Sequence, residues 1–256
     1  MQDYLYDGTF EGFLTCVYHH YYTEPAAGIC LKEEYQSSLL GGFQEVYTDL
    51  EKADRVYQAI RRKISYMDLR RIYKCFLSTV PDKEMILLRY IVLGFHIGSG
   101  ISKLHGNPDV FAAQEIEKKI NVEAERMRQF VRFSVMQGNI LYARIEPDHD
   151  VLELIGDHFS DRFRNDPFLI HDVRRGKAMA GYQGKWYITS FADNDVPEES
   201  EEEKEYQDLW QKYFDHIAIK ERKNSKCQRN FMPLRYRKHL TECQMRRVIL
   251  EGGNSG

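Results

Sequence analysis

Apolar residues recur at helical spacing through much of this chain and at strand spacing in its second half. The first series runs from Phe10 to Tyr21 in steps of three and four residues. Such a series predicts an amphipathic helix, which Glu24-Pro25 ends. Residues 4–6 before it read as a short strand, and residues 29–31 after it as a second one.

The middle of the chain is predicted to be helical. Thr48 and Ser65 each begin a capping-box pattern, and each is followed by apolar residues on one helical face. The apolar run 85–97 predicts a buried helix, because it is too short to span a bilayer. Asn107 and Asn121 then predict the starts of two successive helices, the second reaching residue 137.

Short apolar segments with turn residues between them follow. They lie at residues 140–145, 168–170, 178–180 and 186–188, and a helical series at 151–159 interrupts them. This pattern predicts a small, mainly antiparallel sheet with one inserted helix.

Beyond the predicted sheet the character of the chain changes. Residues 197–203 are strongly acidic, residues 209–217 carry one apolar helical face, and the remainder is basic. We therefore expect an α+β protein, predominantly helical, with a small mainly antiparallel sheet and a long C-terminal helix. Residues 1–193 would form the α+β core. Residues 194–256 would add an acidic linker, the long helix and a basic C-terminal segment packed on that core.

Composition narrows the functional classes. A net charge of −3 argues against a protein that coats nucleic acid through bulk charge. Five scattered cysteines without a Cys-x-x-Cys pair indicate reduced thiols. The first residues lack a signal-sequence pattern. We expect a cytoplasmic protein with no membrane association.

Histidines and aspartates in the second half are the candidates for catalysis: His171, Asp172, His149 and His158. Histidine titrates near neutrality and suits general acid–base work, although adjacent strand residues point to opposite faces. Only His158 and Asp161 have the spacing that two metal ligands on one helix face require. We predict no metal site.

Cations offer a second chemistry. Phosphate contacts are predicted for Arg126, Arg128, Arg132, Arg162, Arg174, Arg175, Arg235, Arg237 and Lys238, with Tyr236 stacking on an unpaired base. The alternative is a solvated basic surface, in which Glu125 forms an ordinary helical ion pair with Arg128.

Several segments together resemble an uncharacterised bacterial family of DNA metabolism or repair proteins. They are DGTFEGFL at 7–14, ERM at 125–127, FVRF at 130–133, ARIEPDH at 143–149, HF at 158–159, RF at 162–163, IHD at 170–172, RR at 174–175 and MPLRYRKHLTE at 232–242. The resemblance extends over nearly the whole chain. One departure is Arg237, where the family commonly has an aromatic residue.

The resemblance implies a setting in DNA maintenance. Members are encoded beside a radical S-adenosylmethionine protein, and related domains are fused to uracil-DNA glycosylase-like domains. The leading hypothesis is an accessory protein that binds DNA and presents a nucleotide to the radical enzyme. That partner would carry the iron–sulfur cluster and S-adenosylmethionine, and no cofactor is predicted on this chain.

Two other functions stay open. The chain could itself be an enzyme that processes damaged nucleotides or nucleic acid with the His/Asp residues named above. It could also be a purely structural partner of the radical enzyme. The sequence leaves undecided the base or lesion, the strand preference and the oligomeric state.

Overall fold

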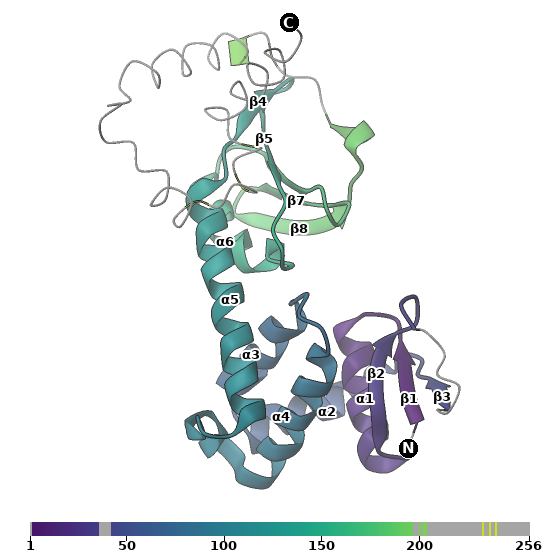
Figure 1. Cartoon of the computed structure of the whole chain (residues 1–256). Coiled ribbons are helices and arrows are strands. Elements are labelled where there is room, and N and C mark those ends of the chain that lie inside the picture. Colours follow the sequence, from purple (N-terminus) through teal and green to yellow (C-terminus); the bar gives the residue numbers. More distant parts are fainter. Residues whose placement is uncertain are drawn as a thin grey trace, which may run out of the picture. The chain divides into compact units, whose positions relative to one another are not determined.

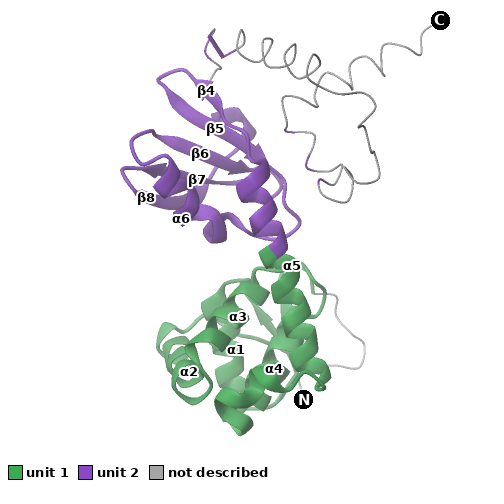
Figure 2. Cartoon of the chain, turned by 90° about the vertical axis from the view of Figure 1, so that its left-hand side faces the viewer, with its two compact units in different colours: residues 1–121 green, residues 122–256 purple. Residues whose placement is uncertain are grey.

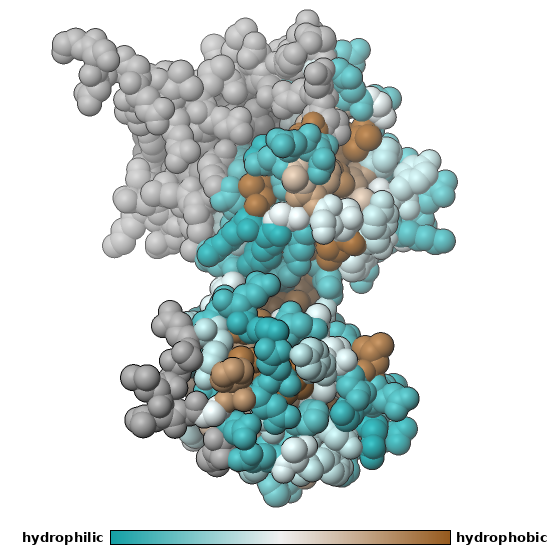
Figure 3. Space-filling view, turned by 90° about the vertical axis from the view of Figure 1, so that its right-hand side faces the viewer, coloured by the Kyte–Doolittle hydropathy of each residue, from teal (hydrophilic) through white to brown (hydrophobic). Residues whose placement is uncertain are grey.

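The computed structural model describes residues 2–35, 42–196, 200, 202–203, 232, 236 and 239. The chain forms two compact units, Met1–Asn121 and Val122–Gly256 (Figure 2). On the face drawn in Figure 3, apolar side chains form patches within a largely hydrophilic surface. Each unit is described by itself below.

Unit 1 begins with a three-stranded parallel sheet. Its strands are β1 (Gln2–Tyr6), β2 (Ala26–Leu31) and β3 (Phe43–Glu45), in the order β2-β1-β3. Helix α1 (Phe10–Tyr22) connects β1 to β2, as a parallel pair requires. Thr9 caps this helix by accepting a hydrogen bond from the Gly12 amide.

Helices complete unit 1 (Figure 1). They are α2 (Leu50–Lys63), α3 (Tyr66–Phe76), α4 (Lys83–Ile97), the 3-10 helix η1 (Gly98–Lys103) and the first part of α5 (Pro108–Phe130). Ser65 caps α3 as predicted, whereas Asp49, and not Thr48, caps α2. The predicted break at Asn121 is wrong, because α5 continues through it and its side chain accepts a hydrogen bond from Lys74.

A buried carboxylate holds the helices of unit 1 together. Asp68 is 1% exposed and accepts hydrogen bonds from the hydroxyls of Tyr90 at 2.6 Å and Ser102 at 2.5 Å. Arg71 lies 2.9 Å from the same oxygen and 2.6 Å from Glu117 of α5. These bonds connect α3 to α4, η1 and α5, so the Arg71 guanidinium is engaged within unit 1.

One helical stretch in the described part of the chain, Lys83–Lys103, is long and apolar enough to cross a membrane by length and composition alone. The core helix of a globular unit satisfies the same criteria. Leu87, Leu88, Tyr90 and Ile91 of this stretch are buried within unit 1.

Unit 2 is built on a five-stranded mixed sheet. The strands are β4 (Ser134–Met136), β5 (Ile140–Ile145), β6 (Phe168–Asp172), β7 (Lys177–Tyr182) and β8 (Lys185–Ser190), and they pair in sequence order. Only β5 and β6 run parallel, and α6 (Leu152–Arg162) connects them. The short helix η2 (Asp193–Asp195) follows β8.

Helix α6 packs on one face of this sheet. Gly156 permits the close approach, because a Cβ atom at that position would lie 2.5 Å from the Trp186 ring of β8. Trp186 also donates a hydrogen bond to Asp157 of α6 at 2.9 Å. The opposite face of β7 and β8 therefore points away from α6.

The predicted fold class needs correction, although the chain is α+β. There are two sheets, one parallel and one mixed, where we expected one small and mainly antiparallel sheet. The reason is that β1 pairs with β2, and β5 with β6, across an intervening helix, and strand spacing alone does not reveal such pairing.

The C-terminal part of that prediction also changes. The described residues contain no long C-terminal helix, and residues 209–217, which carry the apolar face of the predicted one, lie outside them. The two compact units divide between Asn121 and Val122. The predicted division at residues 193 and 194 stays a prediction.

We expect Asp68→Ala to lower the free energy of unfolding by about 3 kcal/mol, because it leaves Arg71 and two buried hydroxyls without their shared acceptor. Ser102→Ala removes one donor only and should cost about 1 kcal/mol. Urea denaturation followed by circular dichroism measures both. Equal effects of the two substitutions would show that Asp68 is not the centre of this network.

Candidate functional site

The carboxyl ends of β5 and β6 lie side by side at one edge of the unit 2 sheet. The register pairs Arg144 with His171 and Ile145 with Asp172. The loops that leave these two strands therefore begin next to each other. In sheets with parallel strands, such an edge commonly carries the binding site.

Glu123 of α5 organises this edge. Its carboxylate is buried, and it accepts hydrogen bonds from the backbone amides of Asp148 at 2.8 Å and His149 at 2.7 Å. It also accepts one from the hydroxyl of Tyr236 at 2.5 Å. One side chain thus joins α5, the loop after β5 and the C-terminal segment.

Asp172 and Arg175 join the loops after β5 and β6. The Arg175 guanidinium lies 2.8 Å from the buried Asp172 carboxylate and donates to the carbonyl oxygens of Pro147 at 3.2 Å and Asp148 at 2.5 Å. Burial raises the pKa of Asp172, although the neighbouring Arg175 opposes that shift. The guanidinium of Arg175 is thus engaged within the protein.

His171 faces the other side of the sheet. Its Nδ1 is 2.9 Å from the Tyr142 hydroxyl and 3.9 Å from Asp193, and the Phe191 ring packs edge-on against it. The side chain is 1% exposed, and burial lowers the pKa of its imidazole. The imidazole is therefore neutral at physiological pH. Burial also raises the pKa of the Tyr142 hydroxyl to about 12.

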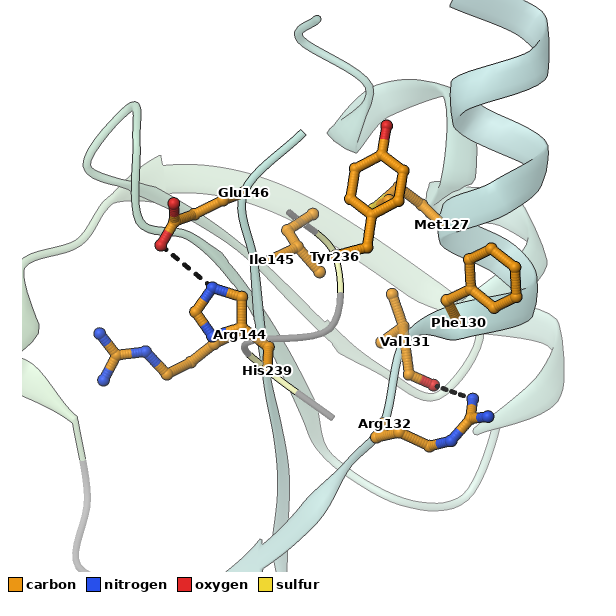
Figure 4. Close-up of a pocket in the computed structure, with 9 residues that line it drawn as sticks. All are labelled: Met127, Phe130, Val131, Arg132, Arg144, Ile145, Glu146, Tyr236 and His239. Atoms are coloured by element: carbon orange, nitrogen blue, oxygen red, sulfur yellow. Dashed lines mark hydrogen bonds and ion pairs between the residues drawn. The ribbon is translucent and has the colours of Figure 1, made fainter. Parts of the chain in front are cut away.

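A surface hollow lies where the end of α5 meets the end of β5 (Figure 4). Its apolar lining comes from Met127, Phe130, Val131 and Ile145, and its polar lining from Arg132, Arg144, Glu146, Tyr236 and His239. His239 Nε2 is 3.0 Å from Glu146 Oε1. The hollow thus combines an apolar surface with two arginines.

The two arginines of the hollow have different settings. Arg132 is exposed and donates to the carbonyl oxygen of Gln129 at 3.0 Å. Arg144 is 40% exposed in its side chain and lies 2.9 Å from Asp193, which is itself 58% exposed. Surface pairs of this kind contribute little to stability, so an incoming anion can replace the Asp193 carboxylate.

The predicted phosphate-binding residues do not all gather at this hollow. Arg132 and Tyr236 line it, whereas Arg128 is held by Glu125 at 2.9 Å and by the carbonyl oxygen of Leu154 at 2.5 Å. Arg174 is exposed near the same sheet edge, 3.6 Å from Asp148.

The remaining predicted contacts lie elsewhere. Arg126 is half-buried on α5, and Arg162 is exposed at the end of α6 beside the Phe163 ring. Arg235, Arg237 and Lys238 lie outside the described residues. Arg144, Glu146 and His239 were not among the predicted site residues, although Arg144 and Glu146 stand at the end of a predicted strand, where functional side chains are common.

The four catalytic candidates take part in separate structures. His171 and Asp172 belong to the two networks described above, on opposite faces of β6. The backbone amide of His149 binds Glu123, and His158 is exposed on α6. Among the described residues, no group of three or more His, Cys, Asp or Glu side chains could hold a metal ion.

Comparison with known proteins identifies a family. A family model described as a domain of unknown function (DUF4130) matches residues 81–242, more than half of the chain. No curated protein matches the sequence.

One solved structure with some similarity is the pGpG-specific phosphodiesterase PggH from Vibrio cholrae. It has 7% sequence identity and a TM-score of 0.34, over 70% of this chain and 81% of that one. A similarity of this size does not establish a shared fold or function.

We expect Glu123→Ala to lower the free energy of unfolding by about 3 kcal/mol, because two buried amides and the Tyr236 hydroxyl lose their acceptor. Tyr236→Phe keeps the ring and should cost about 1 kcal/mol. Chemical denaturation of the full chain compares the two. A Tyr236→Phe variant as stable as the original chain would mean that the hydroxyl–carboxylate bond contributes nothing.

Stability should fall as the pH drops below about 6.5, the ordinary histidine pKa. The reason is that burial lowers the pKa of His171, so the unfolded chain binds a proton at a higher pH than the folded chain. His171→Gln should lessen this loss between about pH 7.5 and pH 5, measured by urea denaturation. The pH dependence of the variant is compared with that of the original chain, because burial also lowers the pKa of His19 and His20 and both chains contain these two histidines.

The exposed His158, substituted as His158→Gln, controls for the loss of a histidine as such. If His171→Gln leaves the pH dependence unchanged, the imidazole is protonated as readily in the folded chain as in the unfolded one.

Proposed function

The chain belongs to the DUF4130 family, and we propose that it binds nucleic acid, with one nucleotide lying against the residues that line the hollow between the ends of α5 and β5. The observation that carries this proposal is the pairing of an apolar lining with Arg132 and Arg144. A base or sugar would contact the apolar side chains. The two guanidinium groups would bind phosphate.

Chemistry and charge support this function. Small-molecule sites in proteins combine apolar walls with a few polar groups, as the lining of this hollow does. Arg144 would exchange the exposed Asp193 carboxylate for a phosphate oxygen at little cost, because the surface ion pair it gives up is weak. Arg174 would add a phosphate contact at the same edge of the sheet.

The buried network beneath the hollow would provide rigidity. Tyr236 lines the hollow and donates to Glu123, which also fixes the loop after β5 through two backbone amides. A ligand would therefore meet a surface whose supporting side chains are already ordered. Preorganisation of this kind reduces the entropy lost on binding.

The biological setting is proposed from the sequence resemblance. The chain would act in DNA maintenance, in the cytoplasm, as the accessory of a radical S-adenosylmethionine protein. That partner would supply the iron–sulfur cluster and the S-adenosylmethionine. This chain would hold the nucleic acid and present one nucleotide.

Arg132→Ala and Arg144→Ala should each weaken DNA binding about tenfold and lessen the slope of log affinity against log salt by about 1. Each substitution removes one phosphate contact, so binding releases correspondingly fewer counterions from the DNA. Fluorescence anisotropy with labelled single- and double-stranded oligonucleotides, between about 50 and about 200 mM salt, measures both quantities.

Arg89→Ala is the matched control. Arg89 is also a surface arginine in an ion pair, 2.7 Å from Asp109, but this residue lies in unit 1. It should change neither affinity nor slope. Salt-independent binding, or no binding to either kind of oligonucleotide with the radical enzyme also present, would refute the proposed function.

A further inference from the structure

The β7–β8 hairpin presents one face of the sheet that α6 does not cover. Strand alternation places Tyr182, Lys185 and Tyr187 on this face, and Trp186 on the opposite face against Gly156 of α6. The hairpin therefore has a packed side and an outward side.

Two large aromatic rings stand on the outward side. Tyr187 is 65% exposed and Tyr182 is 51% exposed. Within the described part of the chain, neither ring packs against another ring and neither hydroxyl has a hydrogen-bond partner. By contrast, Tyr142 on the same sheet is buried and bonded to His171. Packing and hydrogen bonding thus explain why a tyrosine stands at position 142, but they do not explain the two exposed tyrosines.

The register places a small side chain next to one of the rings. Ala180 lies directly opposite Tyr187, and Lys185 directly opposite Tyr182. Ala180 has a small side chain, so a planar group can approach the strands beside the Tyr187 ring. Tyr182 and Tyr187 are diagonal neighbours on the two strands, so their Cα atoms lie about 7–8 Å apart.

The charge of the outward face favours an anionic ligand. Residues 177–190 contain no aspartate or glutamate. Lys177 is paired with Asp150 and lies on the opposite face, so Lys185 is the lysine of the hairpin on the outward side. Lys185 is exposed on the same face as the tyrosines, and Arg164 lies against the turn, where its Nε would be 3.4 Å from a Cβ atom on Gly184. Planar rings next to cations match the bases and phosphates of nucleic acid.

We propose that Tyr182, Lys185 and Tyr187 form a stacking surface for unpaired bases, so that the nucleic acid held by this chain is single-stranded. The inference rests on the proposed function and specifies its ligand. A single strand exposes the faces of its bases, whereas a duplex hides them within its stack. The Cα spacing of about 7–8 Å for diagonal neighbours exceeds the repeat of about 3.4 Å along one strand of duplex DNA, so each ring would receive a base separated from its neighbour.

The test uses the full chain and fluorescence anisotropy with labelled oligothymidylate, an abasic strand of the same length and a duplex. Tyr187→Ala should weaken oligothymidylate binding by about 5- to 30-fold, because the loss of one stacked base has that effect. Binding of the abasic strand and of the duplex should change little. Tyr187→Phe keeps the aromatic face and should bind oligothymidylate as the original chain does.

Tyr47→Ala is the matched control, since it removes a tyrosine that is 79% exposed but lies in unit 1. An unchanged affinity of Tyr187→Ala and Tyr182→Ala for oligothymidylate would overturn the stacking surface, while weaker binding by Arg132→Ala would still support the hollow. Equal losses for the abasic strand and oligothymidylate would also overturn it, because phosphate contact alone would then explain them. If the original chain binds none of the three probes, the proposed function itself fails.

Discussion

The buried carboxylate of Glu123 is the interaction on which the site depends. It accepts hydrogen bonds from two backbone amides of the loop after β5 and from the hydroxyl of Tyr236, a residue 113 positions away. A buried carboxylate is costly unless donors surround it, so the three bonds stabilise one another. The loop and Tyr236 in turn shape the lining of the hollow.

The arginines of unit 2 have two different roles, which their surroundings determine. Arg128 and Arg175 donate to backbone carbonyl oxygens and carboxylates within the unit, where they fix loops and helix ends. Arg132 and Arg144 also have partners, the Gln129 carbonyl oxygen and Asp193, but they line a surface hollow. A protein with a net charge of −3 can still present a local basic surface, because net charge is a sum over the whole chain and these two arginines line the same hollow.

The two proposed contact surfaces belong to one sheet. The hollow lies at the end of β5, and the tyrosine surface lies on β7 and β8, with Arg144 and Tyr187 on the same face by the strand register. Between them, Phe191 packs on His171 and Asp193 pairs with Arg144. This segment after β8 lies between the proposed phosphate-binding region and the proposed base-binding region of the same sheet.

The sequence by itself determined part of the local structure, although it misplaced the cap of α2 and predicted a break within α5. Apolar spacing predicted α1 and α4, and Ser65 predicted the start of α3, because these features depend on residues within one or two turns of each other. Only the tertiary structure decided that β1 and β2, and β5 and β6, pair in parallel, and which arginines face a carboxylate. Both depend on residues far apart in the chain, and a charged side chain has the same local pattern whether its partner is a buried aspartate or solvent.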